Sequence, residues 1–288
     1  MTAVTERVHE VTDPPPLQPV LTLTEEELLV LTDGSLGVVP ARVPEPSDPD
    51  TAALVRSVAL RCLMARGLVL PTGVRPPPGS SRRGEADHPG AAQPVGVSWE
   101  AVEPLGLTLT LRELAPAVLG LRRVLGAPGD PTAQGDDPPA EGTSAVRYLH
   151  LHDEIAVIED VSDAGMHSLL PVFPDRYHDA VADFIRPPDA TAGRGGVRSL
   201  DGTVEALLGD LGGPTVLVES SLITGLHDGV PSEPVTEMLA LGPGGTFRSH
   251  DSVTYHPVDP DGAIRDLLAQ VMGVSQVVGS GAGAGGPT

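Results

Sequence analysis

Two histidines, His150 and His152, stand two residues apart in the segment RYLHLHDE (147–154). On a strand their imidazoles would point to the same face, because side chains alternate along a strand. A His-x-His strand is one way in which β-proteins bind a transition metal, and His167 or Glu154 could supply a further ligand. A solvated strand face carries the same pattern without a metal. We expect no resident metal or cofactor, and we keep His150, His152 and His167 as the metal candidates.

The elements that would position these histidines are predicted by hydrophobic periodicity. Short apolar runs with turn signals between them predict strands, and apolar residues at helical spacing predict the helices that follow. The expected order is strands at 145–152, 154–161 and 166–173, a helix at 174–185, a helix at 200–211, a strand at 215–225, a hairpin across the turn GPGG (242–245), and a last helix that ends at Gly273. The order of a helix, three strands and a helix thus occurs twice along the chain, which predicts two similar halves.

The region before these strands has a helical pattern. Thr24 and Glu27 have the spacing of a capping box, and a second helix is expected from about Asp50 to Arg66. We interpret Cys62 as a buried structural thiol, because it lies in an apolar stripe of that second helix with Val55, Val58 and Ala59. The segment 107–125 fits a strand at its start, but we interpret it as a helix with the apolar face Leu114, Val118, Leu121 and Leu125.

Pro- and Gly-rich stretches delimit the ordered region. We expect one domain, residues 20–273, made of the halves 20–186 and 197–273. Disorder is expected where the composition cannot build a core, at 1–19, 71–94, 126–144 and 274–288. The expected fold class is α+β, with a mostly antiparallel central sheet and helices packed on it.

Charge and composition exclude several classes of function. The net charge of the 288-residue chain is −21, and all 18 basic residues are Arg. Such a surface repels phosphate backbones, so nucleic acid is not an expected partner. A winged helix, formed by the N-terminal helices and the segment ARGLVL, stays an alternative that would make the protein a transcriptional regulator.

The sequence predicts a cytoplasmic protein that does not act at a membrane. The N-terminus lacks the apolar segment of a signal peptide, and no stretch of roughly 18 or more apolar residues could span a bilayer. Cys62 is the single cysteine, which rules out an internal disulfide and a cysteine zinc cluster. No G-x-S-x-G motif occurs, and the carboxylates are scattered over loops and helix caps, so we expect no enzymatic activity.

Three stretches carry a family resemblance within residues 20–273. They are LTLTEEELLVL with the later helix end LMARGLV, the strand pair RYLHLHDEIAVIEDV, and VTEMLALGPGGTFRSHDSVTYHPVDPDGAIRDLLAQV. Together they resemble the EspG family, the cytoplasmic chaperones of type VII (ESX) secretion in actinobacteria. The resemblance implies a largely antiparallel sheet with quasi-two-fold halves, and a helical secretion substrate of PE–PPE or WxG type as partner. The loops at 71–94 and 126–144 look long for this family. A relative with another partner, or a small metalloprotein that uses the His-x-His strand, stays open.

Overall fold

The computed structural model describes residues 17–44, 46–74, 97–125, 146–226 and 230–281. The segments expected to be disordered fall outside these ranges at 1–16, 75–94, 126–144 and 282–288. Three stretches of the expected disorder lie within the described residues. Leu17 packs against the main core, residues 71–74 belong to a strand, and residues 274–281 continue the last helix.

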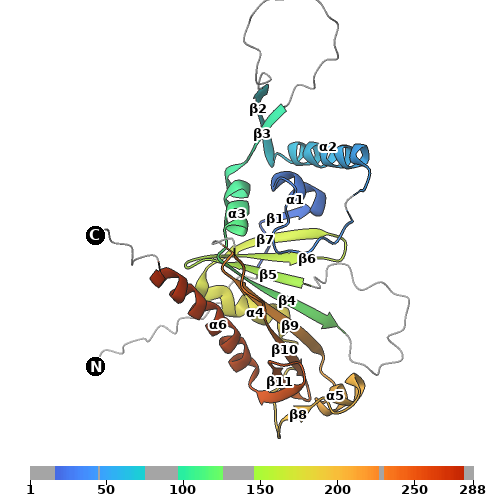
Figure 1. Cartoon of the computed structure of the whole chain (residues 1–288), viewed down its shortest axis with the longest axis vertical. Coiled ribbons are helices and arrows are strands. Elements are labelled where there is room, and N and C mark those ends of the chain that lie inside the picture. The colour runs from blue at the N-terminus through green and yellow to red at the C-terminus, as the bar shows by residue number, and fades with distance from the viewer. Residues whose placement is uncertain (1–16, 45, 75–96, 126–145, 227–229, 282–288) are drawn as a thin grey trace, which may run out of the picture.

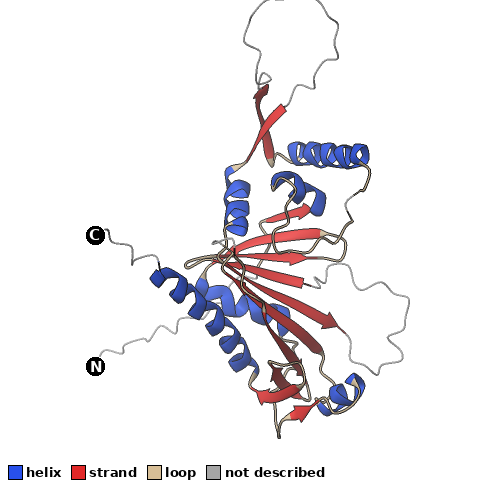
Figure 2. Ribbon diagram, viewed as in Figure 1, coloured by secondary structure: helices blue, strands red, loops and turns tan. Residues whose placement is uncertain are grey.

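A ten-stranded antiparallel sheet runs through the molecule (Figure 2). Its strand order is β1-β7-β6-β5-β4-β9-β10-β11-β12-β8, and every neighbouring pair is antiparallel. The strands are β1 (Leu21–Thr24), β4 (Ala117–Leu125), β5 (Val146–Leu151), β6 (Ala156–Val161), β7 (Met166–Val172), β8 (Arg198–Ser199), β9 (Val216–Thr224), β10 (Val235–Gly242), β11 (Gly245–Ser249) and β12 (Thr254–Val258). The predicted α+β class with a mostly antiparallel sheet is confirmed.

Two four-stranded meanders build most of this sheet. β4 to β7 form the first and β9 to β12 the second, and they join where β4 pairs with β9. A helix follows each meander, α4 (Tyr177–Ile185) after a 3₁₀ turn at Pro174–Arg176, and α6 (Pro260–Gly281). Each meander has one strand more than the sequence predicted, and α6 continues past Gly273.

The segment 107–125 was predicted to be one helix, and this prediction was wrong. It is divided at Pro116 between the end of α3 (Glu103–Glu113) and the strand β4. Proline cannot donate a backbone hydrogen bond and disfavours the helical conformation of the residue before it, so α3 ends before Leu114 and the strand starts after Pro116. Leu119 and Leu121 of β4 are fully buried, whereas Leu114 is 56% exposed.

One face of the sheet is covered by α4 and α6. Apolar side chains of both helices pack against alternate residues of the central strands, in a core that includes Leu119, Leu149, Val218 and Leu239. Removal of this apolar area from water is the main stabilising contribution in such a layer, at about 25 cal/mol per Å².

The opposite face is covered only at its two ends (Figure 1). The first layer packs over β1, β7 and β6 and consists of α1 (Glu25–Leu31), α2 (Pro49–Ala65), α3 and the hairpin β2–β3 (Val69–Val74, Val97–Ala101). The second layer lies at the other end of the sheet and consists of α5 (Val204–Asp210), which packs over β10, β11 and β12. Among the described residues, α3 and the loop at 32–38 lie over this face of β5 and β4 at His150 and Val118, which are buried, whereas Tyr148, Gly120 and Ser221 further along are partly exposed.

The first two helices begin as the sequence predicted. Thr24 caps α1, because its hydroxyl accepts from the Glu27 amide while the Glu27 carboxylate accepts from the Thr24 amide. Asp48 caps α2 by accepting from the Thr51 amide. No described helix has both the length and the apolar character needed to cross a membrane.

Cys62 is exposed on α2, so its interpretation as a buried thiol was wrong. The helix has two apolar stripes. The one that contains Ala59 and Leu63 is buried against the other elements of the first layer. Val58 and Cys62 lie on the other stripe. Helical periodicity alone could not decide which stripe faces the core.

Candidate functional site

A row of small and neutral side chains crosses the uncovered part of the sheet. Tyr148 on β5 is paired with Gly120 on β4, Gly120 with Ser221 on β9, and Ser221 with Thr236 on β10. These four residues and Ile223 are all partly or fully exposed. We call these five residues the open sheet face.

The middle of the open sheet face carries short side chains, at Gly120, Ser221 and Thr236. The Tyr148 ring lies over Gly120, where an added Cβ would come within 3.3 Å of the ring. Ser221 and Thr236 bond to each other through their hydroxyls at 3.3 Å. Burial raises the pKa of Tyr148, so its hydroxyl is neutral at physiological pH. The surface is therefore uncharged in a protein whose net charge is −21.

A pocket of about 400 Å³ adjoins this face next to the first layer. Its lining mixes apolar side chains with the polar groups of a buried network, and comprises Thr32, Ser35, Leu36, Gly37, Val38, Arg112, Glu113, Ala115, Val118, His150 and Leu226. Val118 lies one row beyond Gly120 on the same face of β4 and is paired with Ile223, so the pocket lies beside the open sheet face.

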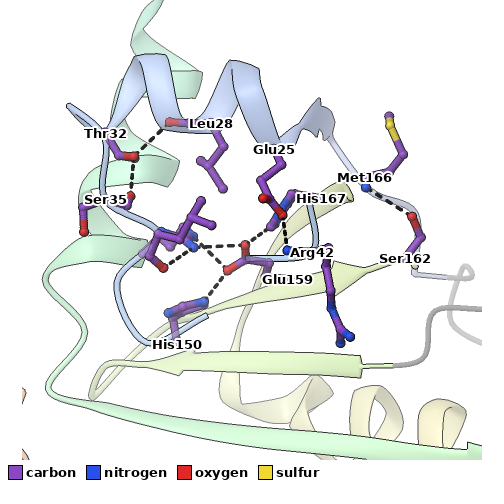
Figure 3. A network of polar contacts seen from close by, with 12 residues as sticks. Glu25, Leu28, Thr32, Ser35, Arg42, His150, Glu159, Ser162, Met166 and His167 are labelled. Carbon is purple, nitrogen blue, oxygen red and sulfur yellow. Dashed lines mark hydrogen bonds and ion pairs between the residues drawn. The ribbon is translucent and has the colours of Figure 1, made fainter. Parts of the chain in front are cut away.

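The buried network is centred on Glu159 of β6, whose side chain is fully buried (Figure 3). Arg112 of α3 donates to both carboxylate oxygens, from Nε at 2.8 Å and from Nη2 at 3.1 Å. The same Nη2 donates to the Leu36 carbonyl at 2.9 Å. His150 Nε2 and His167 Nδ1 each lie 2.7 Å from one Glu159 oxygen. The network therefore joins the first layer to strands β5, β6 and β7.

The carboxylate fixes the tautomers of both imidazoles. An ionised carboxylate only accepts hydrogen bonds, so Nε2 of His150 and Nδ1 of His167 carry the protons. Burial lowers the pKa of His150 more than Glu159 raises it, so this imidazole is neutral. Burial also favours the neutral acid at Glu159, but the hydrogen bonds from both histidines and the charge of Arg112 outweigh it. They hold the pKa of Glu159 far below its ordinary value.

The three metal candidates are not brought together as a ligand set. His150 and His167 share Glu159, but His152 lies apart and its Nε2 is 2.7 Å from the Leu111 carbonyl. Glu154 is exposed in the turn between β5 and β6. Over the described part of the chain, no group of three or more His, Cys, Asp or Glu side chains is arranged to hold a metal ion. The Arg112 guanidinium stands where it would repel a cation at Glu159.

Acid should destabilise the fold in two steps. Glu159 has its ordinary pKa of about 4.5 in the unfolded chain and a lower one in the fold. Its stabilisation is thus complete above pH 4.5 and is lost as the pH falls through the folded pKa. His150 contributes a second loss of stability, which begins as the pH falls to about 6.5. At that pH the His150 side chain binds a proton in the unfolded chain but not in the folded one.

The test is the free energy of unfolding, measured by urea titration between pH 7.5 and 4. His150→Gln keeps an amide donor for Glu159 but does not titrate, so it should flatten the profile between pH 6.5 and 4.5. A variant profile parallel to that of the parent chain would contradict the assignment to His150.

The structure thus defines an α+β protein, built on a mostly antiparallel sheet that is covered on one face and, as far as the described residues go, open at the centre of the other. A scan against protein-family models found no match, and a search of curated proteins found none either. A search of solved structures found the Mycobacterium tuberculosis type VII secretion system chaperone EspG5 in complex with the PE25–PPE41 dimer, at 12% sequence identity and a TM-score of 0.47. That match covers 86% of this chain and 95% of the matched chain.

Proposed function

We propose that this protein is a non-enzymatic chaperone or adaptor of type VII secretion, which holds a helical substrate of PE–PPE or WxG type in the cytoplasm. The proposal extends the local sequence resemblance to the EspG family. The observation that carries it is the open sheet face. In this proposal a helix of the partner lies on that face, as α4 and α6 lie on the other one.

Physical reasons favour a polypeptide as the occupant of this face. A sheet face that permanently meets water usually carries long polar side chains, whereas this one carries Gly120, Ser221 and Ile223. Small residues let the backbone of a partner helix approach closely, and Ile223 and the Tyr148 ring offer apolar contact. The ion pair of Arg122 with Glu219 is exposed at the border of the row and would suit the polar rim of an interface.

Binding to a PE–PPE heterodimer tests the proposal. Ser221→Trp places a large ring at the centre of the open sheet face, and we expect it to raise the Kd at least tenfold, which corresponds to about 1.4 kcal/mol. Asp153→Trp adds the same side chain at the exposed turn between β5 and β6 and should leave the Kd unchanged. Titration calorimetry measures both. Equal affinities for the two variants would refute the site.

A further inference from the structure

One ring nitrogen of His150 has no hydrogen-bond partner among the described residues. The residue is 2% exposed, and its Nε2 donates to Glu159, so its Nδ1 carries a lone pair that can only accept a hydrogen bond. Burial lowers the pKa of His150, so no proton occupies this lone pair at physiological pH. A buried acceptor without a donor is costly in free energy. A donor that reaches Nδ1 from outside the chain would therefore be favourable.

The ring of His150 borders a space that is large enough for such a donor. It is part of the lining of the pocket of about 400 Å³ beside the open sheet face. The two ring nitrogens flank one ring carbon, so Nδ1 faces away from Glu159 while Nε2 faces toward it (Figure 3). Pockets of about 300–1,000 Å³ are the usual size of small-molecule sites.

The other polar groups of the pocket lining already have partners. The Thr32 hydroxyl donates to the Leu28 carbonyl, and the Ser35 hydroxyl accepts from the Gly37 amide. Arg112 donates to Glu159 from Nε and Nη2. The rest of the lining is mainly apolar and consists of Leu36, Val38, Ala115, Val118 and Leu226. The pocket therefore combines apolar side chains with one unused acceptor.

The charges around the pocket favour a neutral ligand. A buried cation needs a counter-charge, but the buried carboxylate of Glu159 already accepts from Arg112 and both histidines. Glu113 in the lining is exposed, so water screens its charge. A carboxylate or phosphate anion would bring a further acceptor against the Nδ1 lone pair and has no hydrogen to donate. An uncharged hydroxyl or N–H group meets neither obstacle.

We propose that this pocket binds a small, uncharged molecule with an apolar body and one hydroxyl or N–H group, which donates to Nδ1 of His150. Phenols and indoles belong to this chemical class. The apolar body packs against the apolar side chains of the lining, and the hydrogen bond sets its orientation. This site is independent of the proposed chaperone function, because it requires no polypeptide partner.

Two naphthalenes that differ in the donor test the proposal. 2-Naphthol has a hydroxyl, and in 2-methoxynaphthalene a methyl group replaces the hydroxyl hydrogen. Titration calorimetry with the full chain at neutral pH should show at least tenfold tighter binding of 2-naphthol. Val38→Trp fills the pocket from a partly exposed position and should weaken this binding at least tenfold. Val253→Trp, at an exposed position before β12, is the matched control and should leave it unchanged.

Nitrogen NMR of the unaltered chain with ¹⁵N-labelled histidine locates the contact. An unprotonated ring nitrogen shifts upfield when it accepts a hydrogen bond, so 2-naphthol should move the His150 Nδ1 resonance upfield and 2-methoxynaphthalene should not. The resonance is assigned by its loss in His150→Gln. An unmoved resonance, equal affinities for the two compounds, or no binding of either would overturn the inference. So would 2-naphthol binding that a folded Val38→Trp variant retains in full.

Discussion

Glu159→Gln is expected to lower the free energy of unfolding by about 3–5 kcal/mol, the usual cost of removing one partner from a buried ion pair. The substitution keeps the size of the side chain but leaves the Arg112 guanidinium buried without a counter-charge. It also removes a charged acceptor from the hydrogen bonds of His150 and His167. Urea unfolding followed by circular dichroism measures the change.

The same substitution on an exposed ion pair of the sheet is the control. Glu219 accepts from Arg122, but the side chains of this pair are 32% and 63% exposed. Exposed pairs contribute about 0–1 kcal/mol, so Glu219→Gln should change stability little. If the two variants were destabilised equally, burial would not be what makes the Glu159 network important.

Leu119→Ala should cost about 2–5 kcal/mol, since it removes a fully buried side chain from the core beneath α4 and α6. Leu114→Ala, in the same segment, should change the stability by no more than about 0.5 kcal/mol, because Leu114 is 56% exposed. Thermal and urea unfolding of both variants give the comparison.

This pair of variants also distinguishes strand from helix in the segment 107–125. A helix with Leu114, Val118, Leu121 and Leu125 on its buried face would make Leu114→Ala the costly change. The strand β4 makes Leu119→Ala the costly one. A larger effect at Leu114 would therefore contradict the position of β4 in the sheet.

Local signals were sufficient for much of the fold. The Thr24 and Glu27 capping box is formed as predicted, and the expected strand at 215–225 is the central strand β9. The turn GPGG joins β10 to β11. Each of these features depends on residues close in the sequence, so a single sequence is enough to predict it.

The parts that were missed depend on contacts between distant residues. Glu159 was dismissed as one of many scattered carboxylates, because its importance comes from Arg112, which is 47 residues away in the sequence. His150 and His167 reach it only through the register of β5, β6 and β7. The open sheet face likewise depends on the pairing of β4 with β9, which joins the two halves of the chain.

Site-specific photo-crosslinking to a PE–PPE heterodimer tests the central claim most directly. A photoreactive amino acid replaces Ser221 in the open sheet face, and Asp153 in the turn between β5 and β6 serves as the reference position. The account predicts a crosslink from position 221 to a helical segment of the partner and none from position 153. A complex that crosslinks only from position 153, or no complex at all, would contradict it.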